Sequence, residues 1–154
     1  MTKFLLVALA LLSGCAEAQT PNFRVEGFTA DEIEVIQDSL DQWCEVSNGK
    51  YCEVIDQNAS NVIRFDSNWS KANLGTTLLD GDTHTITIYN NKDTWDDWYG
   101  LLNSVVLHEL GHHFRGDGHL APMGNDVMSA CGNMTTELTE DDVNGDLLKS
   151  NVCH

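Results

Sequence analysis

The apolar residues of this chain follow a helical period in two stretches. The first is preceded by Thr29 and Glu32, whose spacing is that of a capping box and predicts a helix N-terminus. The second begins at about Trp98 and ends at Gly116 and Gly118, because glycines stop a helix. The two apolar stripes are formed by Ile33, Ile36, Leu40 and Trp43, and by Leu101, Leu102, Val105, Val106 and Leu110.

Three shorter stretches predict strands. Phe23–Glu26 is a candidate first strand, and Asn61–Phe65 alternates weakly between apolar and polar residues. Thr83–Tyr89 alternates cleanly, with Ile86 and Ile88 on one face.

Local turn and cap signals complete the pattern. Asp80-Gly81-Asp82 marks a turn before the last predicted strand. Towards the C-terminus, Thr139 and Asp142 repeat the capping-box spacing in its weaker aspartate form and predict the start of a third helix.

The second helical stretch contains the sequence H-E-x-x-H, from His108 to His112. Residues four apart lie on one face of a helix, so both imidazoles can bind one metal ion. Glu109 would stay off the metal but close to a metal-bound water, where a general base is useful. A zinc ion lowers the pKa of such a water towards neutrality. His119, reached through a turn at 116–118, is the candidate third ligand and leaves a fourth position open.

The motif continues with a glycine, a further histidine and the sequence Asp126-Val127-Met128-Ser129, and in this it resembles the metzincin zinc endopeptidases, most closely the matrixin group. The resemblance implies that Met128 forms a turn beneath the metal, although a methionine can also be an ordinary core residue. It implies an α+β domain with a twisted, mostly parallel sheet, an antiparallel edge strand and three helices. The similarity covers nearly the whole chain after the leader, but only residues 108–128 are specific.

The resemblance also implies an activity, zinc-dependent hydrolysis of peptide bonds with Glu109 as general base. The expected substrate is an extended polypeptide, held as a strand against residues 83–89. Two alternatives stay open. In one, a zinc peptidase uses Glu137 or Glu140 in place of His119 as third ligand. In the other, the domain binds zinc or protein partners without catalysis.

The chain departs from the family pattern between His112 and Gly116, which are one residue further apart than usual. The extra residue could turn His119 away from the metal and bring Asp117 towards it. We expect His119 to remain the ligand, because the glycines on both sides of Asp117 can adopt positive φ angles. No tyrosine closely follows the methionine, so a tyrosine ligand is not expected, and no inhibitory cysteine precedes the domain.

Gly81-Asp82-Thr83-His84 resembles the segment in which many matrixins hold a structural zinc and calcium. The companion histidines and aspartates are missing, so we expect His84 to be a surface residue of its strand. Asp80 and Asp82 are calcium candidates with little support, because two carboxylates in a turn usually form only the turn.

Residues 1–14 have the pattern of an export signal, with Lys3 followed by an apolar run too short to span a bilayer. Leu12-Ser13-Gly14-Cys15 resembles the lipobox of bacterial lipoproteins, which implies a lipid anchor on Cys15 and a membrane-bound protein facing the periplasm or the exterior. Residues 15–22 would then be a tether and 23–154 the zinc peptidase domain. The alternative is an ordinary signal cut after Ala16 or Ala18, which leaves a soluble periplasmic or secreted protein.

The charge of the chain is strongly negative. The formal net charge is -16, and it becomes -17 without Lys3 because the leader contains no acidic residue. This balance argues against nucleic acid as a partner and against electrostatic adhesion to anionic lipid. We expect a monomer.

Four cysteines follow Cys15, and an even number in an exported chain predicts two disulfides. Of three possible connectivities we favour Cys44–Cys52 and Cys131–Cys153, the pairs nearest in sequence. Zinc binding by cysteine is not favoured because no C-x-x-C pair occurs.

Overall fold

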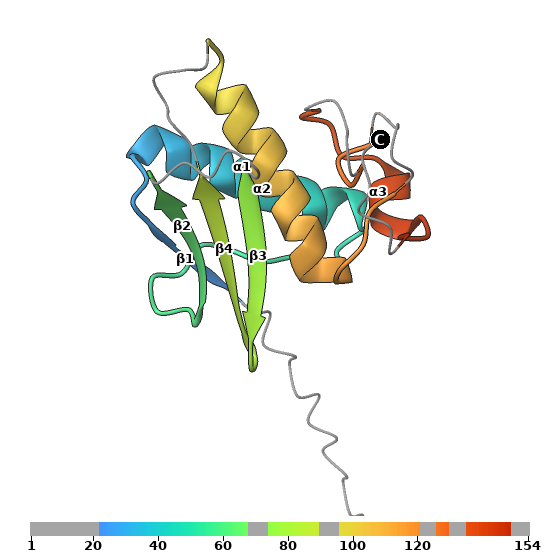
Figure 1. The fold of residues 1–154 in the computed structure, drawn as a ribbon, viewed down its shortest axis with the longest axis horizontal. Coiled ribbons are helices and arrows are strands. Elements are labelled where there is room, and N and C mark those ends of the chain that lie inside the picture. The colour runs from blue at the N-terminus through green and yellow to red at the C-terminus, as the bar shows by residue number, and fades with distance from the viewer. Residues whose placement is uncertain (1–21, 68–73, 90–95, 121–125, 130–134, 149–154) are drawn as a thin grey trace, which may run out of the picture.

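A computed structural model of the chain describes residues 22–67, 74–89, 96–120, 126–129 and 135–148. These residues form an α+β fold of four strands and three helices (Figure 1). In chain order they are β1 (Phe23–Glu26), α1 (Ala30–Val46), β2 (Asn61–Asp66), β3 (Gly75–Asp80), β4 (Thr83–Tyr89), α2 (Trp98–Arg115) and α3 (Glu140–Asn144).

The four strands form one mixed sheet in the order β1-β2-β4-β3. β1 pairs with β2 and β2 with β4 in parallel, whereas β3 runs antiparallel to β4 at the edge. The predicted α+β class, with a mostly parallel sheet, an antiparallel edge strand and three helices, is therefore confirmed. The edge strand itself was not predicted, because Gly75–Asp80 has no apolar alternation.

The hydrophobic core lies between one face of the sheet and the helices α1 and α2, which pack against each other. The predicted stripe of α1 is confirmed for Ile36, Leu40 and Trp43, which are fully buried. Ile86 and Ile88 of β4 are buried on the same side, as the alternation predicted. Burial of these stripes drives the helices onto the sheet.

Both predicted capping boxes are confirmed. The backbone N–H of Thr29 donates to Glu32 Oε2 at 2.7 Å, and Thr29 Oγ1 accepts from the Glu32 backbone. Glu32 Oε1 also accepts a hydrogen bond of 2.7 Å from Trp98 Nε1, so the same carboxylate joins the first turns of α1 and α2. Thr139 and Asp142 form the second box at the start of α3. Short polar motifs in the sequence thus fix where two helices begin.

The expectation that substrate pairs with residues 83–89 is wrong. That segment is β4, which is hydrogen-bonded to β2 on one side and to β3 on the other. Its backbone donors and acceptors are therefore already used inside the sheet. A peptide can add only to an edge, and the edge nearest α2 is β3.

The expectation that His84 is a surface residue holds only in part. Its ring is partly buried and lies 4.3 Å, centroid to centroid, from the ring of His113 on α2. Asp80 and Asp82, by contrast, are exposed in the β3–β4 turn, where Gly81 has φ of 62°. Among the described residues these two carboxylates belong to no group of three potential metal ligands, so the calcium prediction gains no support.

The Cys44–Cys52 disulfide is present and ties the end of α1 to the following loop. Three further predictions lie outside the described residues. They are the second disulfide, Cys131–Cys153, the lipidation site Cys15 and the leader. No helix in the described part of the chain has the length and apolar character needed to cross a bilayer.

We predict that replacing both Cys44 and Cys52 with serine lowers the free energy of unfolding. The bond joins residues 8 apart in sequence. Closing a loop of this size stabilises the folded state by about 2.5 kcal/mol, because it lowers the entropy of the unfolded chain. Urea unfolding of wild type and double variant measures the difference. Reductant should destabilise wild type by more than the double variant, in which only the predicted Cys131–Cys153 bond is left to reduce. Equal midpoints for the two proteins would contradict the prediction.

Candidate metal centre

The helix α2 carries the H-E-x-x-H sequence, and three kinds of contact hold it in place. Asp97 caps its N-terminus by accepting from the backbone of Gly100 at 2.9 Å. Trp43 of α1 donates from Nε1 to the carbonyl of Leu107 at 3.0 Å, directly before His108. Leu107 and Leu110 are fully buried, so the helix turns its apolar side to the core. The motif histidines therefore project from a rigid element.

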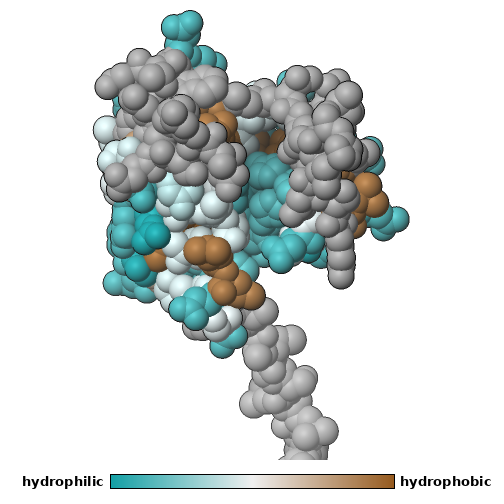
Figure 2. Space-filling model, viewed as in Figure 1, coloured by the Kyte–Doolittle hydropathy of each residue, from teal (hydrophilic) through white to brown (hydrophobic). Residues whose placement is uncertain are grey.

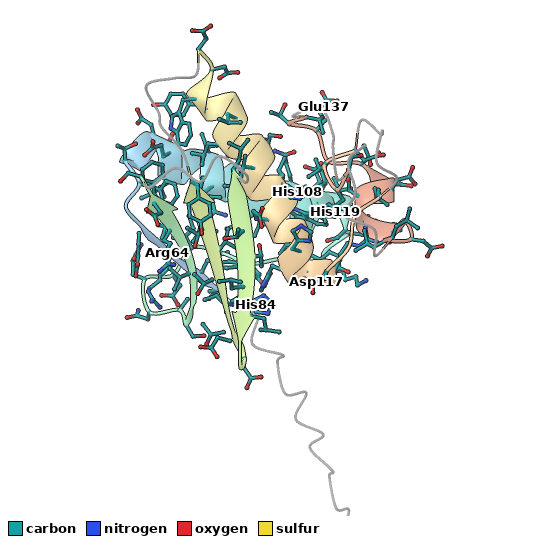
Figure 3. All side chains as sticks on the ribbon, viewed as in Figure 1. Arg64, His84, His108, Asp117, His119 and Glu137 are labelled. Carbon is teal, nitrogen blue, oxygen red and sulfur yellow. A yellow bond between two sulfur atoms is a disulfide. The ribbon has the colours of Figure 1, made fainter. Side chains whose placement is uncertain are left out.

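Three histidines converge at the outer side of this helix. His108 Nε2 lies 3.2 Å from His112 Nε2 and 3.3 Å from His119 Nε2. One nitrogen of each ring lies within 4.8 Å of the other two, and no other group of three or more potential ligands occurs among the described residues. The structure thus brings together the three residues that the sequence proposed as ligands. Figure 3 shows two of them, His108 and His119, close to each other.

The donor set fits a metal ion. His108 donates from Nδ1 to the carbonyl of Val127 at 2.7 Å, which leaves a bare lone pair on Nε2. His112 makes the same kind of contact, longer at 3.4 Å, with the carbonyl of Gly116. Burial lowers the pKa of His108. Burial, and then the neighbouring His108 and His119, lower the pKa of His112 to about 4. Neutral imidazoles with facing lone pairs are suited to a cation, which could be held by all three.

The loop after α2 returns His119 to the helix, as the two glycines predicted. The helix continues to Arg115, and the chain turns at Gly116 and Gly118, whose φ angles are 85° and 142°. Asp117 between them is exposed. The backbone of His119 exchanges two hydrogen bonds with Leu148, of 3.0 and 2.6 Å. The pairing returns His119 to the helix while Asp117 points to solvent.

Met128 packs against the helix that carries the three-histidine centre. It is fully buried, and its sulfur packs so closely on Gly111 that a Cβ there would lie 2.0 Å from it. The Met128 backbone N–H donates to Asp142 Oδ1 at 2.8 Å, and the other carboxylate oxygen of Asp142 accepts from Thr139. The cap of α3 thereby also fixes the Met128 turn.

Glu109 lies one residue from His108, and only 5% of its surface is exposed. Thr77 of β3 donates from its hydroxyl to Glu109 Oε2 at 2.7 Å and also lies 3.0 Å from the Glu109 carbonyl. Burial raises the pKa of Glu109 to about 7, against the opposite effect of the Thr77 hydrogen bond. A carboxyl group with such a pKa can accept and release a proton near neutral pH.

The edge strand leaves room for that carboxylate. A Cβ at Gly75 would lie 2.7 Å from Glu109 Cγ and Oε1. Any side chain at this position would displace the carboxylate. Neither Thr77 nor Gly75 was predicted as a site residue, because their contacts with Glu109 span 32 and 34 positions of sequence.

The downstream glutamates are not part of the centre. Glu137 and Glu140 are exposed, and neither belongs to the histidine group among the described residues. Figure 3 shows Glu137 well apart from His108 and His119. The geometry therefore favours His119 over a glutamate as third ligand.

The comparisons with known proteins give no family. No model of a known protein family matches the chain, and no curated protein sequence matches it. Inference about the function therefore starts from the site.

We predict that His119→Ala weakens zinc binding by more than the roughly 10–100-fold typical of losing a group that only supports a ligand. The reason is that His119 supplies one of only three nitrogens. Zinc titration against a competing chelator measures the affinity.

Asp117→Ala is the matched control, because the residue lies in the same loop and is exposed. Its zinc affinity should equal that of wild type. A greater loss in Asp117→Ala than in His119→Ala would show that the extra residue has changed the ligand set.

Proposed function

We propose that this protein is a zinc-dependent endopeptidase of metzincin-like fold. The observation that carries the proposal is the convergence of His108, His112 and His119, with the buried Glu109 beside them. Three imidazole ligands and an open fourth position are typical of catalytic rather than structural zinc. The antiparallel edge strand beside the metal-binding helix agrees with the arrangement that the family resemblance implies.

Zinc suits the centre because imidazole nitrogens are among its preferred ligands and tetrahedral geometry needs no further protein group. When bound, the ion would supply Lewis acidity, which lowers the pKa of water and polarises a carbonyl. His108 and His112 would hold it through Nε2, since the Nδ1 atoms of both rings are directed to backbone carbonyls.

Glu109 would handle the proton in each half of the reaction. It would first accept a proton from the attacking water and then deliver that proton to the nitrogen of the departing amine. Thr77 holds the carboxylate in place, and Gly75 leaves the space that the carboxylate occupies. A side chain fixed on both sides in this way is pre-organised for the reaction.

The substrate would add as a strand to the outer edge of β3, which pairs with no second strand among the described residues. β3 passes directly beside Glu109 through Thr77. Figure 2 shows a hydrophilic hollow next to this strand and apolar surface towards its end, where Leu78 and Leu79 are 61% and 64% exposed. Backbone pairing would hold an extended peptide of varied sequence, and the leucines would favour apolar side chains.

The alternative without catalysis is less well supported, because binding alone gives no reason to bury a carboxyl group beside the ligands. We also propose that the chain is exported and anchored through lipid on Cys15. This part of the proposal is supported by the leader sequence.

We predict that Glu109→Ala retains zinc but loses about 10²–10⁴-fold in turnover, the usual contribution of general acid–base catalysis. The assay is cleavage of an unstructured protein by the purified chain, with zinc content measured on the same samples. Glu137→Ala and Glu140→Ala are the controls and should keep full activity. Equal turnover in wild type and Glu109→Ala would refute the mechanism.

We further predict that Thr77→Val lowers kcat about tenfold with little change in KM. Valine keeps the shape of threonine but removes the hydroxyl, and one hydrogen bond to a charged group is worth about 1.5 kcal/mol. Thr77→Ser should restore most of the rate, because its hydroxyl can reach the same oxygen. If serine and valine behave alike, the hydroxyl has no part in the reaction.

A further inference from the structure

A second pair of histidines lies on the inner side of α2. His113 follows His112 directly, but its ring faces β4, where it meets His84. The two ring centroids are 4.3 Å apart and the planes cross at 86°. The His108 and His112 rings of the metal centre have nearly the same arrangement, at 4.8 Å and 88°. Two imidazoles at this separation and angle can share one ion after a small opening.

Glu53 fixes the ring of His113. Its Oε1 lies 2.7 Å from His113 Nε2, and the two side chains are only 3% and 6% exposed. An Nε2–H that donates to this carboxylate leaves Nδ1 of His113 as a bare lone pair. Metal-binding histidines are typically held in this way by a carboxylate on the far ring nitrogen.

Three buried polar atoms around this pair have no hydrogen-bond partner in the described part of the chain. They are His84 Nδ1, His113 Nδ1 and Glu53 Oε2. Burial, and then the neighbouring His113, lower the pKa of His84. Burial raises the pKa of Glu53, and a nearby cation would oppose that effect. Buried polar atoms are nearly always satisfied, so a group of three without partners needs an explanation.

The three residues line one open cavity of about 330 Å³, and Tyr51 and Phe114 also line it. Water occupies about 30 Å³ per molecule in the liquid, so the space holds an ion with several waters. The disulfide at Cys52 fixes the chain directly before Glu53.

We propose that His84 and His113 bind a second divalent transition-metal ion, with Glu53 holding the His113 ring from behind. Imidazole suits zinc, copper and nickel. The described residues provide no third ligand in reach, so water fills the other positions and binding is weaker than at the His108 centre. The ion would join β4 to α2 behind the metal centre. This site is separate from the proposed catalytic function and does not depend on it.

The test is the metal stoichiometry of the full chain, freed of metal and titrated calorimetrically with zinc ion. Wild type should bind two equivalents with distinct affinities, and the second should raise the melting temperature further. His84→Ala should bind one equivalent at unchanged high affinity. Thr85→Ala, on the same strand but the opposite face, should bind two.

Glu53→Gln tests the supporting carboxylate without changing its size. It should weaken only the second equivalent, by about 10–100-fold. His119→Ala should weaken only the first, which separates the two sites. One equivalent in wild type, or two in His84→Ala, would overturn the proposal and leave the peptidase proposal intact. A wild type that binds no zinc would overturn both.

Discussion

The convergence of three imidazole rings is the constraint on which the rest of this structure depends. His108 Nε2 lies 3.2 Å from His112 Nε2 and 3.3 Å from His119 Nε2. Without a cation, these contacts give little in return for the hydration that each ring loses. The surrounding fold must therefore hold the rings in place. The free energy of metal binding would offset the cost of burying them together.

The support for this constraint comes from contacts between distant parts of the chain. The hydrogen bond from Trp43 Nε1 to the Leu107 carbonyl fixes the position of α2 one residue before the first ligand. Asp142 is fully buried and joins the cap of α3 to the Met128 turn. Arg115, at the end of α2, donates to the carbonyls of Asp142 and Gly145 and so links the metal helix to α3. The ligands are thus positioned by rigid elements on both sides.

Local features of the fold and the site were predicted from the sequence, whereas contacts between distant segments were not. Some features depend only on residues within a few helical turns, so they could be recognised without a structure. These are the two capping boxes, the apolar stripe on α1 and the spacing of His108 and His112. The glycines at 116 and 118 likewise revealed a loop that could return His119. The edge strand lacked alternation, and the contacts of Thr77 with Glu109 and of Glu53 with His113 join segments 32 and 60 positions apart. Placing substrate on residues 83–89 failed for the same reason, because strand order is a tertiary property.

Helical geometry explains why one helix can serve two sites. Consecutive residues of an α-helix point about 100° apart, so His112 and His113 face different surroundings although they are neighbours. His112 faces outward to the His108 centre, while His113 faces β4 and the loop after the disulfide. The two sites therefore use adjacent residues of one helix but share no ligand, so each can be lost by substitution while the other is kept.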